Sequence, residues 1–164
     1  MTTWTEFEQQ APETAGVFQR RWEKTGLGLL ATLRRDGFPR ISPMEPDLSA
    51  GQLWIGSMPG STKSADLLRD PRCCLHSATE DKEVANGDAK LWGVVRDTSD
   101  EDRRAFVASV KERTGNDLDA MGLGFDLWRL DLTAASAVQV GADHEHLRIT
   151  VWKAGEQERV IERR

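Results

Sequence analysis

The sequence contains no tyrosine, only two cysteines and no long apolar run. Because Cys73 and Cys74 are adjacent, they exclude a disulfide framework and zinc patterns that need spaced thiols. Positive charge is also scarce: 22 basic and 27 acidic residues give a net charge of -5, which excludes the basic footprint of a general nucleic-acid binder. No segment has the pattern of a signal peptide or of a membrane span. We therefore expect a cytoplasmic protein with neither a nucleic-acid nor a membrane partner.

The length and composition are those of a globular protein. A chain of 164 residues predicts a single domain, 1–164, that buries a core without needing a metal or a disulfide. Hydrophobic residues make up 38% and charged residues 30%, with 14 glycines and 6 prolines, which excludes disorder and collagen-like repeats.

The first half of the chain changes from a helical to a strand period. Residues 12–24 predict an N-terminal amphipathic helix that begins at Pro12. Alternation over 27–33 predicts a strand, and Asp36-Gly37 predicts a tight hairpin turn after it. The return strand, 39–48, contains Pro43 and Pro46, which cannot donate ladder hydrogen bonds, so it is expected at a sheet edge or bulge.

Further short strands and helices follow. Strands are predicted at 52–57, 72–78, 89–96, 125–133, 137–140 and 146–153, and helices at 61–70 and 100–113. The segment 79–88 is interpreted as an exposed connection, and both Glu80 to Glu83 and the basic end (Arg159, Arg163, Arg164) as solvated surface. Short strands in hairpins with few helices predict a mainly β (α+β) fold, an antiparallel barrel with peripheral helices.

The segment after the 52–57 strand favours anion binding. Ser57 ends this strand, a turn follows at 58–60, and Ser61, Lys63 and Ser64 open the next helix. The start of a helix offers unpaired N–H groups and a positive dipole end, to which these residues add hydroxyls and an ammonium group. Gly60 and Lys63 are not adjacent, so this is not a Walker A loop. The alternative is that Ser61 is only an N-cap and Lys63 a solvated side chain.

Three segments together resemble a known family. They are RISPM at 40–44, LWIGS at 53–57 and GSTKSADLLRDPR at 60–72. They are similar to the flavin-binding core of the pyridoxamine 5'-phosphate oxidase-like split-barrel proteins, a superfamily that includes deazaflavin-dependent reductases. The resemblance covers roughly 27–96. It implies a split β-barrel, a homodimer with two cofactor sites at the subunit interface, and FMN or the deazaflavin coenzyme as cofactor.

The same resemblance implies roles for individual residues. Arg40, Ile41 and Ser42 would line the isoalloxazine or ribityl side of the cofactor. Ser57 would bind its phosphate end, while Ser61 and Lys63, with Ser64 in the same helix start, would hold the phosphate itself. Thr62 stands where many members carry a second basic residue, and Asp88 stands where the oxidases carry a flavin-contacting glutamine. The C-terminal segment lacks the oxidases' signature, which argues against oxidation of pyridoxamine 5'-phosphate.

The sequence is compatible with several hypotheses about function. The first is redox chemistry on a small organic substrate, in which the cofactor supplies the hydride chemistry. The others are a non-catalytic flavin carrier or sensor, and a haem-binding relative that uses His76, His144 or His146 as axial ligand. His144 and His146 have the spacing of a metal pair on one strand face, but Asp143 and Glu145 beside them favour a turn. Cys73 and Cys74 are interpreted as strand residues that face opposite ways.

Overall fold

The computed structural model of the chain describes residues 1–80, 82, 84, 86–122, 124–141 and 143–164. Across these residues it contains four helices and nine strands, and every strand pairing is antiparallel. The helices are α1 (Trp4–Gln10), α2 (Pro12–Thr25), α3 (Thr62–Arg69) and α4 (Asp100–Thr114). The strands are β1 (Gly28–Leu33), β2 (Pro39–Met44), β3 (Asp47–Ser49), β4 (Gln52–Ser57), β5 (Arg72–Ser77), β6 (Asp88–Asp97), β7 (Asp126–Val140), β8 (Leu147–Lys153) and β9 (Arg159–Arg163). Among the described helices, none is long and apolar enough to cross a membrane.

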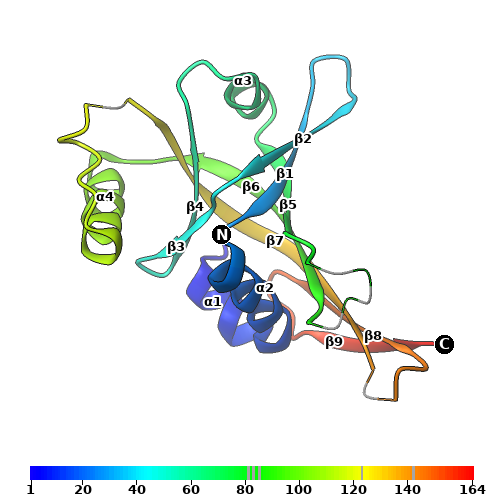
Figure 1. Cartoon of the computed structure of the whole chain (residues 1–164). Helices are drawn as coiled ribbons and strands as arrows, with labels where there is room; N and C mark the ends of the chain where they lie inside the picture. Colours follow the sequence, from blue (N-terminus) through cyan, green and yellow to red (C-terminus); the bar gives the residue numbers. More distant parts are fainter. Residues whose placement is uncertain (81, 83, 85, 123, 142) are drawn as a thin grey trace.

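The sheet closes on itself as a barrel. Its strand order is β2-β1-β5-β6-β7-β4-β3, so β2 and β3 lie at opposite ends of the order. Only Glu45 and Pro46 separate these two strands in the chain, and the sheet must therefore curl until its ends meet (Figure 1). β8 and β9 continue from β7 away from the barrel and carry the C-terminus. The mainly β split-barrel class predicted from the sequence is confirmed.

The proline-containing return strand has the expected edge position. β2 pairs with β1 alone, and the predicted strand 39–48 is interrupted at Glu45 and Pro46 before β3 begins. Pro46 cannot donate a ladder hydrogen bond, so it suits the place where the chain stops pairing with β1 and starts pairing with β4. The hairpin turn between β1 and β2 is confirmed, with Gly37 at φ +84°.

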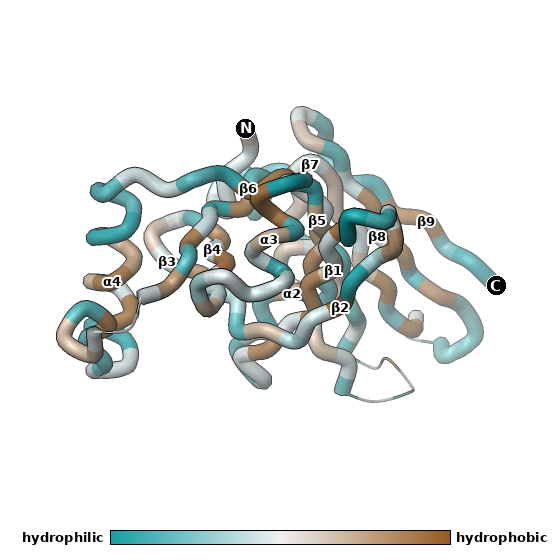
Figure 2. Tube along the Cα trace, turned by 90° about the horizontal axis from the view of Figure 1, so that it is seen from above, coloured by the Kyte–Doolittle hydropathy of each residue, from teal (hydrophilic) through white to brown (hydrophobic). Residues whose placement is uncertain are grey.

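The main core fills the barrel and extends to the two N-terminal helices. Leu30, Leu75 and Leu91 from three neighbouring strands are fully buried. At one end, Phe7 of α1 packs against Trp152 of β8 with ring centroids 4.8 Å apart. At the other end, Leu67 of α3 belongs to the same core. Figure 2 shows these apolar strand segments in the middle of the fold and a hydrophilic C-terminal end.

A second, smaller cluster attaches α4 to the outside of the barrel. Phe106 and Val107 of α4 pack with Trp54 of β4 and Leu127 of β7. The helix begins with a capping box between Ser99 and Asp102 and ends at Gly115, which agrees with the helix predicted at 100–113. In Figure 1, α4 stands apart from α1 and α2.

Three elements differ from the sequence prediction. α1 was not predicted, because its seven residues are too few for a clear helical period, although Thr3 and Glu6 form a capping box. The two strands predicted at 125–133 and 137–140 are one strand, β7, because pairing with β6 and then β8 carries it through Ala134 to Ser136. The basic end forms β9, whose side chains are nevertheless exposed as predicted.

The prediction that Glu80 is solvated surface was wrong. Its side chain is only 14% exposed and lies 2.7 Å from the buried guanidinium of Arg21 on α2. Lys24 makes a second ion pair with the same carboxylate. Two cations of α2 thus hold this part of the connection against that helix. Asp81 and Glu83, included in the same prediction, lie outside the described residues.

Candidate functional site

The start of α3 gathers three serine hydroxyls. Gly60, at φ +70°, turns the chain after β4, and Ser61 becomes the N-cap of α3. The Oγ of Ser61 lies 2.7 Å from the Oγ of Ser57 and 2.9 Å from the Oγ of Ser64. It also accepts a hydrogen bond from the backbone N–H of Ser64 at 3.2 Å. The structure therefore brings together the three serines that the sequence singled out.

Lys63 adds an uncommitted positive charge to this helix start. It lies in the first turn of α3 and is half-buried. Within the described part of the chain, no hydrogen bond or ion pair engages its ammonium group. Backbone N–H groups, hydroxyls and an unpaired ammonium at one helix end form a combination that favours a phosphate group.

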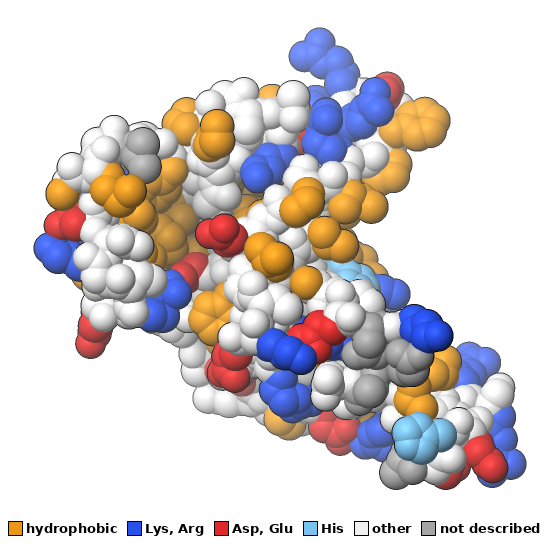
Figure 3. Space-filling model, in the orientation of Figure 1, with side chains coloured by type: hydrophobic (Ala, Val, Ile, Leu, Met, Phe, Trp, Pro, Cys, Tyr) orange, Lys and Arg blue, Asp and Glu red, His pale blue; other side chains and the backbone are white. Residues whose placement is uncertain are grey.

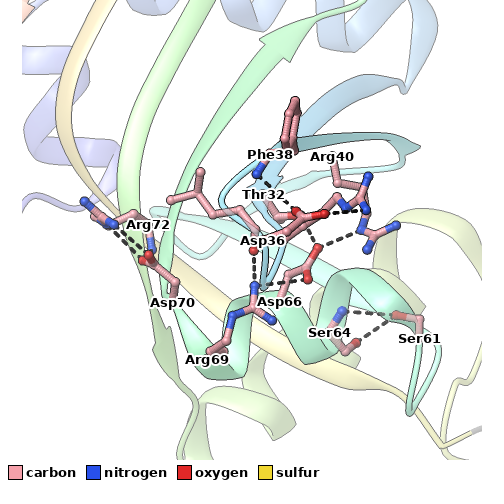
Figure 4. A network of polar contacts seen from close by, with 12 residues as sticks. Thr32, Asp36, Phe38, Arg40, Ser61, Ser64, Asp66, Arg69, Asp70 and Arg72 are labelled. Carbon is pink, nitrogen blue, oxygen red and sulfur yellow. Dashed lines mark hydrogen bonds and ion pairs between the residues drawn. The ribbon is translucent and has the colours of Figure 1, made fainter.

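A buried carboxylate lies one turn further along α3. Asp66 is 3% exposed and accepts hydrogen bonds from Thr32 of β1 at 3.0 Å and from Arg40 of β2 at 2.7 Å. Arg69, also on α3, donates a third at 3.2 Å. Figure 4 shows these side chains converging between the helix and the two strands. Asp66 thus joins three elements and fixes two guanidinium groups close to the helix.

The ionisation of Asp66 follows from these partners. Burial alone disfavours its charged form, but the hydrogen bonds from Arg40, Thr32 and Arg69 outweigh that effect and lower the pKa of Asp66. The group is a carboxylate at neutral pH, so the network carries two positive charges and one negative charge. The net charge of the network is therefore positive, which would stabilise an anion bound next to it.

The three candidate residues of β2 lie on two faces. Arg40 and Ser42 are half-buried and share the parity of buried Met44, so they face the barrel side. Ile41 points the other way and is 67% exposed. The structure therefore separates Ile41 from the α3 network, and only Arg40 contacts α3 directly.

A cavity lies at the other end of β2. It has a volume of about 700 Å³ and opens between the end of α2, the β2–β3 link and α4. Figure 3 shows a hollow lined with hydrophobic side chains beside α4. The lining residues are Trp22, Glu23, Thr25, Gly26, Leu27, Glu45, Pro46, Asp47, Phe106, Val110, Arg113, Thr114, Asn116 and Leu118. We call this cavity the α2–α4 pocket.

The histidines are dispersed. His76 is half-buried on β5 with its Nδ1 2.5 Å from the carbonyl oxygen of Ser77. His144 lies in a turn at φ +58°, and His146 lies 2.7 Å from Asp143. Among the described residues, no group of three or more potential ligands could hold a metal ion. The turn interpretation of this segment is confirmed.

The structure also places Asp88 and the two cysteines, which the sequence analysis singled out. Asp88 accepts a hydrogen bond from Thr79 at 2.8 Å and lies 3.4 Å from buried Arg21. The two cysteines face opposite ways, as predicted, with Cys73 buried and Cys74 half-buried. Burial raises the pKa of Cys73 to about 12, with a smaller effect from Cys74, and this excludes a ready thiolate at neutral pH.

Sequence reasoning missed Asp66 and the α2–α4 pocket. Asp66 was part of a quoted segment, and its position between Lys63 and Arg69 on α3 was the available signal. The pocket had no such signal, because Trp22, Glu45 and Arg113 come from three distant parts of the chain.

Comparison with solved structures finds the same fold in several proteins. PhzG from Burkholderia lata 383, in complex with tetrahydrophenazine-1-carboxylic acid, shares 12% identity over 93% of this chain and 92% of its own, with a TM-score of 0.64. A heme binding protein from Mycobacterium smegmatis shares 22% identity over 84% of this chain and 57% of its own, with a TM-score of 0.58. An F420 reductase shares 20% identity over 66% of this chain and 87% of its own, with a TM-score of 0.52.

Comparison with curated proteins finds no match. The family model described as pyridoxamine 5'-phosphate oxidase matches residues 16–149, a range that includes β1 to β7 and the start of α3. That range holds most of the chain and every candidate residue described above. The chain belongs to the pyridoxamine 5'-phosphate oxidase family.

Proposed function

We propose that the protein is a homodimeric, flavin-dependent oxidoreductase that binds FMN and acts on a small organic substrate. The observation that carries this proposal is the start of α3, where three hydroxyls meet beside Lys63, whose ammonium group has no partner among the residues that the structure describes. Membership of the family supports a flavin or a related ligand at this site. The absence of the oxidase signature from the C-terminal segment, β8 and β9 included, favours a substrate other than pyridoxamine 5'-phosphate.

The residues of α3 would bind the phosphate of the cofactor. Ser61 and Ser64 would donate hydrogen bonds from their hydroxyls, and Lys63 would supply charge. Ser57 would orient the hydroxyl of Ser61, from which it lies 2.7 Å. Arg40, held by Asp66, would add positive field without leaving its ion pair. Bound FMN would supply hydride transfer, and the protein's part is to fix the ring and limit access of water.

The outer face of the barrel supports the dimer. Ile41 of β2 pairs with Ala31 of β1, Ala31 with Cys74 of β5, and Cys74 with Trp92 of β6. We call these four residues the outer apolar row. Ile41 is 67% and Trp92 38% exposed, and hydrophobic side chains gather over β1 and β2 in Figure 3. Because this apolar row crosses four strands and is exposed to solvent, its burial against a second copy of the chain is favourable.

A titration with two flavins tests the phosphate site. Lys63→Ala should weaken FMN binding about 10- to 100-fold, the range for losing one charge-assisted hydrogen bond of ~1.5 to 3 kcal/mol. Riboflavin, which lacks the phosphate, should bind both forms equally. The matched control is Lys153→Ala, at the exposed last residue of β8, which should leave both affinities unchanged. Equal FMN affinity for Lys63→Ala and the unchanged protein would contradict the assignment.

Light scattering tests the dimer. Ile41→Glu should give a monomer, because a carboxylate would replace an apolar side chain in the middle of the proposed interface. Met121→Glu, at a position that is 55% exposed and lies outside the outer apolar row, should leave the dimer intact. A monomeric unchanged protein at micromolar concentration would refute the proposal.

The absorption spectrum separates the alternatives. Flavin absorption bands in the purified protein would support FMN. Activity that returns only when a deazaflavin is added would support the deazaflavin coenzyme, an alternative that the structural similarity to an F420 reductase favours. A Soret band would support the hypothesis of a haem-binding protein, which the structural similarity to the heme binding protein from M. smegmatis suggests. A flavin-loaded protein that oxidises no reduced nicotinamide and reduces no substrate would be a carrier or sensor.

A further inference from the structure

Arg21 of α2 binds both ends of the connection between β5 and β6. Its side chain is 1% exposed, and its Nε donates a hydrogen bond to the carbonyl oxygen of Gly87 at 2.5 Å. Its terminal nitrogens lie 2.7 Å from a carboxylate oxygen of Glu80 and 3.4 Å from one of Asp88. Thr79 donates a hydrogen bond to Asp88 at 2.8 Å, which joins the two ends to each other. One buried guanidinium thus attaches both ends of the connection to the helix.

The fold requires glycine at position 87. The φ of Gly87 is +78°, in the region that residues with a side chain disfavour. A Cβ there would lie 2.5 Å from Cγ of Gln139 and 3.0 Å from the carbonyl oxygen of Val138. The residue before it, Asn86, is exposed, and its side chain has no hydrogen-bond partner among the residues that the structure describes. A glycine that the fold cannot replace therefore follows an exposed asparagine.

An asparagine followed by glycine can lose ammonia without an enzyme, because glycine has no side chain to hinder the approach of its main-chain nitrogen. The nitrogen of Gly87 gives up its proton and attacks the side-chain Cγ of Asn86. A C–N bond forms, the bond from Cγ to the amide nitrogen breaks, and ammonia leaves a five-membered succinimide. Water then opens either carbonyl of this ring. The products are aspartate and isoaspartate, and in isoaspartate the main chain is one carbon longer.

The folded state opposes the first of these steps. The N–H of Gly87 donates a hydrogen bond to the carbonyl oxygen of Val84 at 3.0 Å, and this bond must break before the nitrogen can attack. The carbonyl oxygen of Gly87 is held by buried Arg21, which limits rotation of the backbone on the other side of the residue. Gly87 is itself buried. The reaction therefore requires a local opening in which Arg21 releases the connection.

We propose that Asn86 is a site of spontaneous deamidation and that Arg21 controls its rate. The reaction also makes the opening permanent. A new carboxylate at position 86 would repel those of Glu80 and Asp88. In isoaspartate, the added carbon would displace Gly87 from a place that has no room for one more carbon. Arg21 could then no longer bind both ends of the connection. This inference does not depend on the proposed function.

Peptide mapping by mass spectrometry during incubation at pH 8 measures the rate. Deamidation raises the mass of the tryptic peptide 83–90 and divides its chromatographic peak into aspartate and isoaspartate forms. We expect the folded protein to react at least about tenfold more slowly than the protein unfolded in guanidinium chloride, a factor that corresponds to ~1.4 kcal/mol of opening free energy. Asn116, the other asparagine of the chain, is exposed and precedes Asp117, so it is an internal control that should remain unmodified.

Variants identify the group that slows the reaction. Arg21→Gln should raise the rate in the folded protein several-fold, because it removes the charge that holds both ends of the connection. Arg20→Gln, at the exposed neighbouring position on α2, is the matched control and should leave the rate unchanged. If Arg21→Gln does not fold, Glu80→Gln replaces it, since this change keeps the side-chain shape and removes one ion pair. Near-UV circular dichroism identifies the variants that fold.

The outcomes decide both parts of the inference. Equal rates in the folded and unfolded protein, or equal rates in the folded Arg21 and Arg20 variants, would overturn the control by Arg21. Hydrogen exchange of the Gly87 N–H, followed by NMR, tests the second part. It should be faster in isolated deamidated protein than in the unchanged protein, and equal exchange would show that the connection closes again. FMN binding enters none of these measurements, so their failure would leave the proposed function untouched.

Discussion

Replacing the buried carboxylate of Asp66 should destabilise the fold. Asp66→Asn keeps the shape of the side chain but removes its charge and turns one acceptor into a donor. It would affect the hydrogen bonds that Asp66 accepts from Thr32, Arg40 and Arg69. Because these partners lie on β1, β2 and α3, the change acts on the contact between the helix and the barrel.

The size of the effect follows from exposure. A hydrogen bond to a charged group contributes ~1.5 to 3 kcal/mol and a neutral one about 1 kcal/mol. Arg40 and Arg69 are 31% and 34% exposed, so water restores part of their hydration when the carboxylate is lost. We expect Asp66→Asn to lower the free energy of unfolding by ~2 to 3 kcal/mol. For a chain of this length, this corresponds to a fall in Tm of roughly 5 to 10 °C.

The effect should depend on pH with a defined sign. The folded state lowers the pKa of Asp66 below its ordinary value of 3.8. A carboxyl whose pKa is depressed stabilises the fold fully above its unfolded pKa, and this stability is lost as pH falls through the folded pKa. The difference between the unchanged protein and Asp66→Asn should be complete at pH 7 and shrink below pH 3.8.

Urea denaturation at a series of pH values measures this difference. Asp36→Asn is the matched control, because Asp36 pairs with Arg34 on the hairpin where both side chains are about half exposed. Its effect should stay within ~0.5 kcal/mol. A loss below that figure for Asp66→Asn, or a loss that does not change between pH 7 and pH 3, would refute the reasoning.

Two further predictions concern backbone space and thiol reactivity. Gly93→Ala should cost ~2 kcal/mol or more in urea denaturation, because its Cβ would lie 2.3 Å from the carbonyl oxygen of Asp131. Gly56→Ala, with nothing within 4 Å of its Cβ, should change stability by less than about 1 kcal/mol, and equal losses would contradict the packing argument. In Cys74→Ser, the remaining thiol of Cys73 should not react with a thiol reagent at pH 8 until denaturant is added, since its pKa is about 12. Rapid labelling of the folded variant would show that the burial is incomplete.

The sequence predicted the elements whose signals are local. The alternation over β1, the turn at Gly37 and the helix start at Ser61 depend on neighbouring residues, and the structure has all three where the sequence predicted them. α1 and β9 were missed because they are short and owe their stability to other parts of the chain. Phe7 is buried by β8, and β9 exists only as the partner of β8.

By itself, the sequence determined the barrel class, the family resemblance and the helix start at Ser61, because each depends on residues close together in the chain. Only the tertiary structure decided that Arg40, and not Ile41, is on the side of β2 that contacts α3, that Asp66 holds two arginines, and that Trp22, Glu45 and Arg113 share one cavity. These facts require strand register and the packing of distant helices, and register follows from the whole set of side chains that the closed sheet must bury.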